Sequence, residues 1–213
     1  MFMLILKNEK REIFKMEHNA KGYHFYAMLS RMKYINRWGL MRNTRQENIS
    51  EHSLEVAMIA HSLAVIKNQR FGGSVNPERV ALLAVFHDAT EIITGDLPTP
   101  VKYYNPEIRT AYRQVEDMAT YRLLSMLPED LQPAYEPLLS PTEEEKELWR
   151  LVKAADKISA LIKCIEEKSM GNEEFHQAEL ALREAVSHLR CPEVDCFLEE
   201  FLPSYSLTLD EQE

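Results

Sequence analysis

The scarcity of glycine and the helical spacing of apolar residues constrain this fold more than any other feature of the chain. Only six glycines occur in 213 residues, and residues with high helix propensity dominate. Apolar side chains recur at the spacing of a helix face, as at Leu54, Ala57 and Met58. No alternation of strands with helices is visible, so the sequence predicts an all-α fold.

Start and stop signals divide the chain into predicted helices. Asn48 or Ser50 could cap the second helix, an Asn-Pro-Glu run opens the third, and Gly95 ends it. Two proline-rich segments are predicted to lack helix: 96–106 as a loop and 127–141 as a linker of short turns. The helices themselves are expected at about 25–34, 50–68, 77–94, 108–126, 141–168 and 172–189.

Length and composition indicate a single globular domain. Apolar residues make up 45% and charged residues 28% of the chain, which is ordinary for such a domain. The start, MFMLILKNEKREIFK, runs from apolar to charged, which is the reverse of a secretory signal. We therefore expect residues 1–19 to be a leader or N-terminal extension, either poorly ordered or forming an extra helix or strand. Residues 20–213 are expected to form the domain.

The net charge and the cysteines restrict the classes of partner. A net charge of −9 without a basic stripe argues against nucleic acid, and no apolar run reaches the length of a bilayer span. A small phosphorylated ligand remains compatible, because a pocket can be positive on an acidic protein. Three cysteines at unpatterned spacing indicate reduced thiols and a cytoplasmic protein.

Residues 86–96, FHDATEIITGD, place ionisable groups directly behind the apolar run VALLAV. Burying such groups is costly unless they have partners. Glu91 follows His87 by four residues and Asp88 by three, so all three would border one face of the predicted helix. A His-Asp dipeptide alone is a weak motif, and a hydrogen-bonded core histidine or a solvated helix edge would also explain it.

Residues on two other predicted helices favour a metal site. His52 lies near the start of a helix with a strongly apolar face, and Asp156 lies between Val152 and Ile158 on another. Each alone has an ordinary explanation, a buried histidine with a hydrogen bond or an aspartate paired with an arginine. Two imidazoles and two carboxylates together suit a divalent transition-metal ion. The candidate ligands are His52, His87, Asp88 and Asp156.

A His, then His-Asp, then a distant Asp, each on a helix, resembles the HD-domain metal-dependent phosphohydrolases. Three segments are similar to the bacterial 5′-deoxynucleotidases of that family: LSRMKYINRWGLMRNTRQENISEHSLEVAMIAH, FHDATEIITGDLPTPVKYYN and LVKAADKISALIKCIEE. The similarity covers about residues 23–210. It implies an HD-domain helical bundle that forms homodimers, dephosphorylates deoxyribonucleoside 5′-monophosphates and discriminates against ribonucleotides. It also implies a divalent metal cofactor, with cobalt, manganese or copper as activators.

The resemblance also implies roles for individual residues. The metal ligands of the family fall on His52, His87, Asp88 and Asp156. Its catalytic residues fall on Glu91, Asp96, Arg37 and Trp38. Its substrate contacts fall on Arg37, Trp38, Asp88, Asp96, Leu97, Pro98, Thr99 and Asp156.

The chemistry of these residue types agrees with those roles. Arg37 offers a planar fork of donors that fits phosphate, and Glu91 could relay a proton to or from a water molecule. Asp96 could either bind a sugar hydroxyl or protonate the leaving O5′. Trp38 or Leu97 could form an apolar wall near C2′, where an unpaired hydroxyl would be penalised.

Two other functions fit part of the same pattern. The site could act on another nucleotide phosphoester, or the chain could be a non-catalytic nucleotide-binding regulatory module. Glu91 and Asp96 beside a full ligand set argue against the module, which needs no proton relay. Lys102 and Arg45 are expected to be surface cations, with contact to the phosphate as the lesser alternative. The residues leave open the physiological metal, the base preference and any contribution of the dimer interface to the site.

Overall fold

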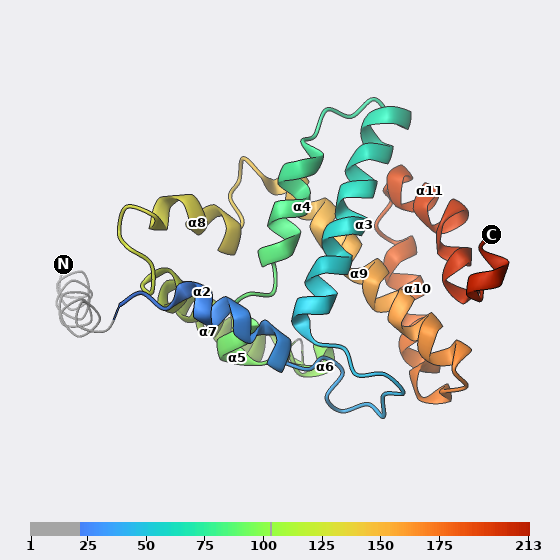
Figure 1. Ribbon diagram of the computed structural model, residues 1–213, viewed down its shortest axis with the longest axis horizontal. Helices are drawn as coiled ribbons and strands as arrows, with labels where there is room; N and C mark the ends of the chain where they lie inside the picture. The colour runs from blue at the N-terminus through green and yellow to red at the C-terminus, as the bar shows by residue number, and fades with distance from the viewer. Residues whose placement is uncertain (1–21, 103) are drawn as a thin grey trace.

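The fold is helical throughout the part of the chain that the computed structural model describes, residues 22–102 and 104–213 (Figure 1). The only strand-like pairing among these residues is an isolated bridge between Asn36 and Asn48. The prediction for residues 1–19 lies outside the described residues. The α-helices are α2 (Phe25–Leu29), α3 (Ile49–Arg70), α4 (Pro77–Phe86), α5 (Glu91–Thr94), α6 (Thr99–Lys102), α7 (Pro106–Leu124), α8 (Gln132–Leu139), α9 (Lys146–Ser169), α10 (His176–Ser187) and α11 (Pro192–Glu200). The 3₁₀ helices are η1 (Ser30–Tyr34), η2 (Glu173–Phe175), η3 (Leu202–Ser206) and η4 (Leu209–Glu211).

Helices α3 and α9 form the centre of this single domain. Helix α3 packs against α4, α9 and α11, and α9 packs against α4, α10 and η3. In Figure 1, α3 and α4 lie side by side, and α9 crosses them toward the red C-terminal helices. The facing side chains form one apolar core that includes Leu63, Leu83, Leu161 and Val194. Full burial of such a side chain contributes about 1.5–3 kcal/mol to folding.

A smaller apolar cluster lies where α2 meets the end of α7. Phe25, Ala89 and Leu123 belong to it, while Phe86 and Tyr135 contact both this cluster and the main core. Ala89 lies in the turn after α4 and is fully buried. The turn is therefore held in place by apolar packing at its centre.

The predicted helix 77–94 is interrupted at this turn. Helix α4 ends at Phe86, and α5 begins at Glu91. Between them, the N–H groups of His87, Ala89 and Glu91 each bond to the carbonyl three residues earlier. Such bonds wind the chain more tightly than an α-helix does. The break carries no glycine or proline, so the usual sequence signals did not reveal it.

The prediction that the two proline-rich segments lack helix was wrong. Helix α6 lies within 96–106, and α8 lies within 127–141. Proline is tolerated in the first turn of α8, where its missing N–H would have no helical partner. Leu138 and Leu139 of α8 are buried, and their burial offsets the unfavourable Pro137 inside this short helix.

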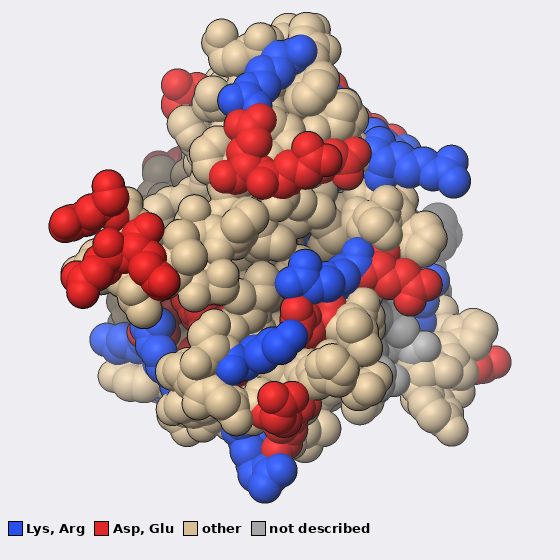
Figure 2. All heavy atoms as spheres, turned by 90° about the vertical axis from the view of Figure 1, so that its right-hand side faces the viewer, with Lys and Arg blue, Asp and Glu red and all other residues tan. Residues whose placement is uncertain are grey.

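No helix among the described residues combines the length and apolar character that a membrane crossing requires. On the face drawn in Figure 2, basic and acidic side chains both occur, with other residues between them. Cys164, Cys191 and Cys196 are free thiols.

Candidate metal centre

His52 lies in the first turn of α3, and the start of that helix is fixed by Asn48. The Asn48 side chain accepts hydrogen bonds from the N–H groups of Ser50 and Glu51, at 3.0 and 3.1 Å. Asn48 rather than Ser50 is therefore the cap of this helix. With the helix start fixed, His52 falls on the inward face of α3, where it is fully buried.

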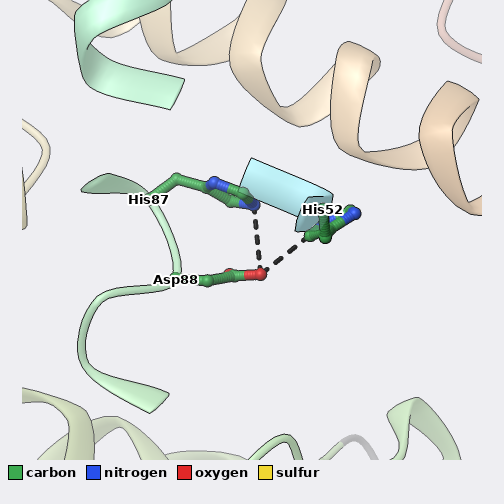
Figure 3. Close-up of side chains that lie close together, drawn as sticks. All are labelled: His52, His87 and Asp88. Atoms are coloured by element: carbon green, nitrogen blue, oxygen red, sulfur yellow. Dashed lines mark ion pairs between the residues drawn. The ribbon is translucent and has the colours of Figure 1, made fainter. Parts of the chain in front are cut away.

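The Asp88 carboxylate lies between two imidazole rings (Figure 3). Its Oδ2 is 3.2 Å from Nε2 of His87 and 3.6 Å from Nε2 of His52. One ligand atom from each of the three residues lies within 4.8 Å of the other two. Metal bonds to such atoms measure about 2.0–2.2 Å, so a single ion between the three is compatible with this spacing.

The hydrogen bonds of His87 also fit a metal ligand. Its Nδ1 lies 2.6 Å from the carbonyl oxygen of Ala84, while its Nε2 is buried and has no hydrogen-bond partner. Metal-binding histidines commonly donate their other ring N–H to a carbonyl in this way. Burial opposes the charged imidazole, but the Asp88 carboxylate outweighs it and raises the pKa of His87 to about 9. The site thus favours a positive charge, from a proton or from a metal ion.

Asp156, the fourth predicted ligand, extends from α9 to His52. Its Oδ1 is 3.1 Å from Nε2 of His52 and 3.9 Å from Nη2 of Arg37. Burial works against the ionised carboxylate, but His52 lowers the pKa of Asp156 to about 2. Asp156 is not part of the group within 4.8 Å, so its carboxylate would have to come closer to His87 and Asp88 to join them as a ligand of the same ion.

Arg37 approaches the same point from the loop that precedes α3. Its Nη1 lies 2.7 Å from Nδ1 of His52 and 2.9 Å from Oε2 of Glu47. The side chain is only 12% exposed, so Arg37 is not a surface cation. Burial disfavours its charge, but nearby carboxylates, first Glu47 and then Asp156, raise the pKa of Arg37. The guanidinium therefore stays charged beside the candidate ligands.

Glu91 is buried in the first turn of α5, and only one of its two carboxylate oxygens has a hydrogen-bond partner. Oε1 accepts a hydrogen bond from Nζ of Lys102 at 2.7 Å, whereas Oε2 is buried without a partner. Burial and the neighbouring Asp88 carboxylate raise the pKa of Glu91 to about 8, against the opposing effect of Lys102. The expectation that Lys102 is a surface cation was wrong, because its side chain is 18% exposed. Arg45, by contrast, is 69% exposed.

The predicted substrate loop lies beside Trp38. The Asp96 carboxylate accepts a hydrogen bond from the backbone N–H of Trp38 at 3.3 Å. Leu97 and Pro98 follow outside any helix and are partly buried. The side chain of Thr99 lies outside the described part of the structure.

Two residues in contact with the candidate site were not singled out from the sequence. Glu47 accepts hydrogen bonds from Arg37 and from the indole of Trp38. Ser159 Oγ lies 3.0 Å from Nδ1 of His52. Ser159 follows Asp156 by three residues on the same helix face, a spacing that could have revealed it. Glu47 lies in the polar stretch NTRQEN, which carries no such signal.

The chain resembles known proteins over most of its length. The family described as 5′-deoxynucleotidase YfbR-like matches residues 24–205. A 5′-deoxynucleotidase of Erwinia tasmaniensis is 55% identical over 188 residues, which cover 88% of this chain and 95% of that protein. A 5′-deoxynucleotidase of Vibrio parahaemolyticus is 53% identical over 191 residues, covering 90% and 98% of the two chains.

A similar fold has also been solved. The crystal structure of an HD-domain phosphohydrolase from Listeria innocua superposes with a TM-score of 0.75 at 27% identity, covering 85% of this chain and 88% of that one. The HD-domain fold predicted from the sequence is thereby confirmed. With a family match over most of its length and relatives above 50% identity, the chain belongs to the YfbR-like 5′-deoxynucleotidase family.

Proposed function

We propose that this 5′-deoxynucleotidase holds a divalent metal ion with His52, His87, Asp88 and Asp156 and hydrolyses deoxyribonucleoside 5′-monophosphates to deoxyribonucleosides and phosphate. The observation that carries the proposal is the convergence of two imidazole nitrogens and the Asp88 carboxylate beside the largely buried guanidinium of Arg37. A nitrogen and oxygen ligand set suits several transition ions, of which Co²⁺ and Mn²⁺ are the first to test.

Arg37 binds the phosphate of the substrate in this proposal. Its guanidinium is planar, permanently charged and shaped to donate two hydrogen bonds to one phosphate group. A divalent ion held at His52, His87 and Asp88 supplies Lewis acidity toward the phosphate oxygens and makes a nearby water molecule more acidic. Arg37 and the residues that would hold the ion therefore place the phosphate group between two positive charges.

Glu91 serves as the proton acceptor for the attacking water. Its Oε2 is buried without a hydrogen-bond partner, and its Oε1 is held by Lys102. A carboxylate fixed in this way presents one oxygen to a proton without rotating. With a pKa of about 8, Glu91 changes between its protonated form and its proton-accepting, ionised form close to neutral pH.

Asp96 binds the sugar, and a neighbouring apolar wall excludes ribonucleotides. One Asp96 oxygen accepts from Trp38, which leaves the carboxylate oriented to accept from a sugar hydroxyl as well. Trp38 and Leu97 form the wall near C2′, and Pro98 and Thr99 complete the loop around the sugar. Substituting Trp38 or Leu97 by alanine would then admit ribonucleotides, and variants that still excluded them would refute this assignment.

We also infer a homodimer that acts in the cytoplasm. Helix α3 exposes Leu54 and Met58 one turn apart, and its neighbour α4 exposes Leu82 and Val85. Exposed apolar faces of this kind support self-association. The free thiols support a reducing compartment. Light scattering of the protein and of a Leu54→Glu, Met58→Glu variant tests the dimer, and cell fractionation tests the location.

The decisive experiment measures phosphate release by metal-stripped protein. The substrates are dAMP against AMP and dTMP against UMP, with no metal or with Co²⁺, Mn²⁺, Mg²⁺ or Zn²⁺ added back. We expect metal-dependent release from the deoxy forms alone, and none from Asp88→Asn. Equal release from both sugars would refute the discrimination against ribonucleotides. No release despite bound metal would favour another phosphoester or a regulatory module.

A further inference from the structure

A single oxygen of Glu47 bonds to both side chains of the Arg37–Trp38 pair. Oε2 accepts from Nη1 of Arg37 at 2.9 Å and from Nε1 of Trp38 at 3.1 Å. The Glu47 side chain is itself 13% exposed. Charge-assisted hydrogen bonds are stronger than neutral ones, and shelter from water reduces competition for them.

The backbone brings Glu47 to this pair independently of the side chains. The N–H of Arg37 donates to the carbonyl of Glu47 at 2.9 Å, next to the antiparallel bridge between Asn36 and Asn48. Since Asn48 also caps α3, this short pairing links the Arg37–Trp38 pair to the helix that carries His52. Glu47 therefore lies at a fixed place relative to the candidate ligands.

The backbone of Trp38 is held in an unfavourable conformation. Its φ of 58° lies in the left-handed region, which residues with a side chain seldom adopt. Such conformations persist where several contacts hold them. The carbonyl of Trp38 accepts from Asn43 and Met41, its N–H donates to Asp96, and its indole donates to Glu47. Hydrogen bonds to the backbone of Trp38 and to its indole N–H thus fix the position of the indole.

We propose that Glu47 is a positioning residue that fixes the guanidinium of Arg37 and the indole of Trp38 relative to each other, so that phosphate and nucleoside are recognised together. The inference rests on the proposed function, because it takes Arg37 and Trp38 as the residues that contact substrate. Without the Glu47 charge, the guanidinium would be drawn toward Asp156, whose Oδ1 is already 3.9 Å from Nη2. A guanidinium that pairs with Asp156 is withdrawn from the phosphate.

The kinetic test compares Glu47→Gln with Glu51→Gln. Glutamine keeps the size of the side chain and removes its charge, and Glu51 is a half-exposed carboxylate in the first turn of α3. We expect Glu47→Gln to raise the KM for dAMP by about tenfold or more, with a smaller change in kcat and unchanged metal affinity. Glu51→Gln should match the unsubstituted enzyme. An unchanged KM in Glu47→Gln, or a parallel loss of metal affinity, would overturn the inference.

A second readout needs no turnover. The chain has two tryptophans, so Trp149→Phe leaves Trp38 as the sole indole. In this background and without substrate, Glu47→Gln should shift the Trp38 emission to longer wavelength and increase its quenching by acrylamide. If Glu47→Gln does not fold, the hydrogen exchange of the single indole N–H can be measured with Glu47 intact. Slow exchange would support the hydrogen bond from the Trp38 indole to Glu47, and fast exchange would refute it. Failure of the unsubstituted enzyme to hydrolyse dAMP would refute the proposed function alone, because the emission and exchange results do not depend on activity.

Discussion

The ammonium nitrogen of Lys102 lies 2.7 Å from Oε1 of Glu91, although the two residues belong to different short helices, α6 and α5. The same nitrogen lies 5.3 Å from the ring centroid of Tyr112, so the Lys102 side chain is held from two sides. Glu91 begins the helix that follows the His87–Asp88 turn. Lys102 therefore acts on the charge of the residue that we assign as the proton acceptor.

Replacing Lys102 by methionine should move the acidic limb of the pH–activity profile to higher pH. Burial and Asp88 raise the pKa of Glu91 to about 8, and Lys102 opposes them. Without Lys102 that pKa rises further, and the protonated carboxyl cannot accept a proton. We expect kcat/KM at pH 7 to fall by about tenfold per unit of pKa shift and to recover at higher pH. The measurement is kcat/KM against pH, with Lys102→Arg as the control that keeps the charge. Superimposable profiles for Lys102→Met and the unsubstituted enzyme would contradict the assignment.

Metal binding should raise the melting temperature of metal-stripped protein. A ligand that binds only the folded state adds about 2.7 kcal/mol to stability at a hundred times its Kd. For a chain of this size, we expect a rise in Tm of about 5–10 °C, since each kcal/mol is worth about 2–4 °C. His87→Ala should lose most of the shift. His61→Ala removes an exposed histidine from the same helix as His52 and should keep it. An equal metal-induced rise in Tm in both variants would show that the metal binds at another site.

Helical periodicity and residue spacing predicted the all-α class and suggested which residues to examine as ligands. They did not predict the break between Phe86 and Glu91, because the tight turn there is held by the burial of Ala89 rather than by glycine or proline. Contacts across loops were also missed. Lys102 and Glu47 contact their partners only in the tertiary fold, and the spacing of residues along the chain does not predict such contacts.

The buried Glu167 carboxylate ties the loop that carries Trp38 to α9. It accepts hydrogen bonds from the backbone N–H groups of Thr44 and Arg45, at 2.8 and 3.2 Å. Lys163 and Asn172 donate to it as well. Replacing Glu167 by glutamine leaves the buried Lys163 ammonium without its counter-charge. We expect the free energy of unfolding to fall by about 1–3 kcal/mol at pH 7.

This contribution should depend on pH. Burial opposes the ionised Glu167, but its hydrogen bonds, led by that from Lys163, lower its pKa to about 2. Because a glutamate in the unfolded chain titrates near pH 4.3, the stabilisation is complete above about pH 4.3 and is lost as the pH falls toward 2. Urea unfolding at pH 7, 5 and 3.5 should show the difference from Glu167→Gln narrowing only at the lowest pH. The exposed Glu173→Gln is the control, and a gap that stayed constant would contradict the pKa assignment.

Gly95 determines where the substrate loop leaves α5, and its replacement by alanine should affect substrate binding. Its φ of 74° and ψ of 159° lie in a region that essentially only glycine adopts, and a Cβ added there would meet no atom within 4 Å, so the cost is conformational and amounts to about 1–3 kcal/mol. Relaxation of that strain would displace the next residue, Asp96, from the N–H of Trp38. Gly72→Ala is a matched control, because Gly72 also has a positive φ of 68° and open space, but follows the far end of α3 from His52. Urea unfolding should show a loss of stability in both variants, whereas only Gly95→Ala should raise the KM for dAMP. Equal KM values in the two variants would show that the geometry at Gly95 does not position Asp96 for substrate.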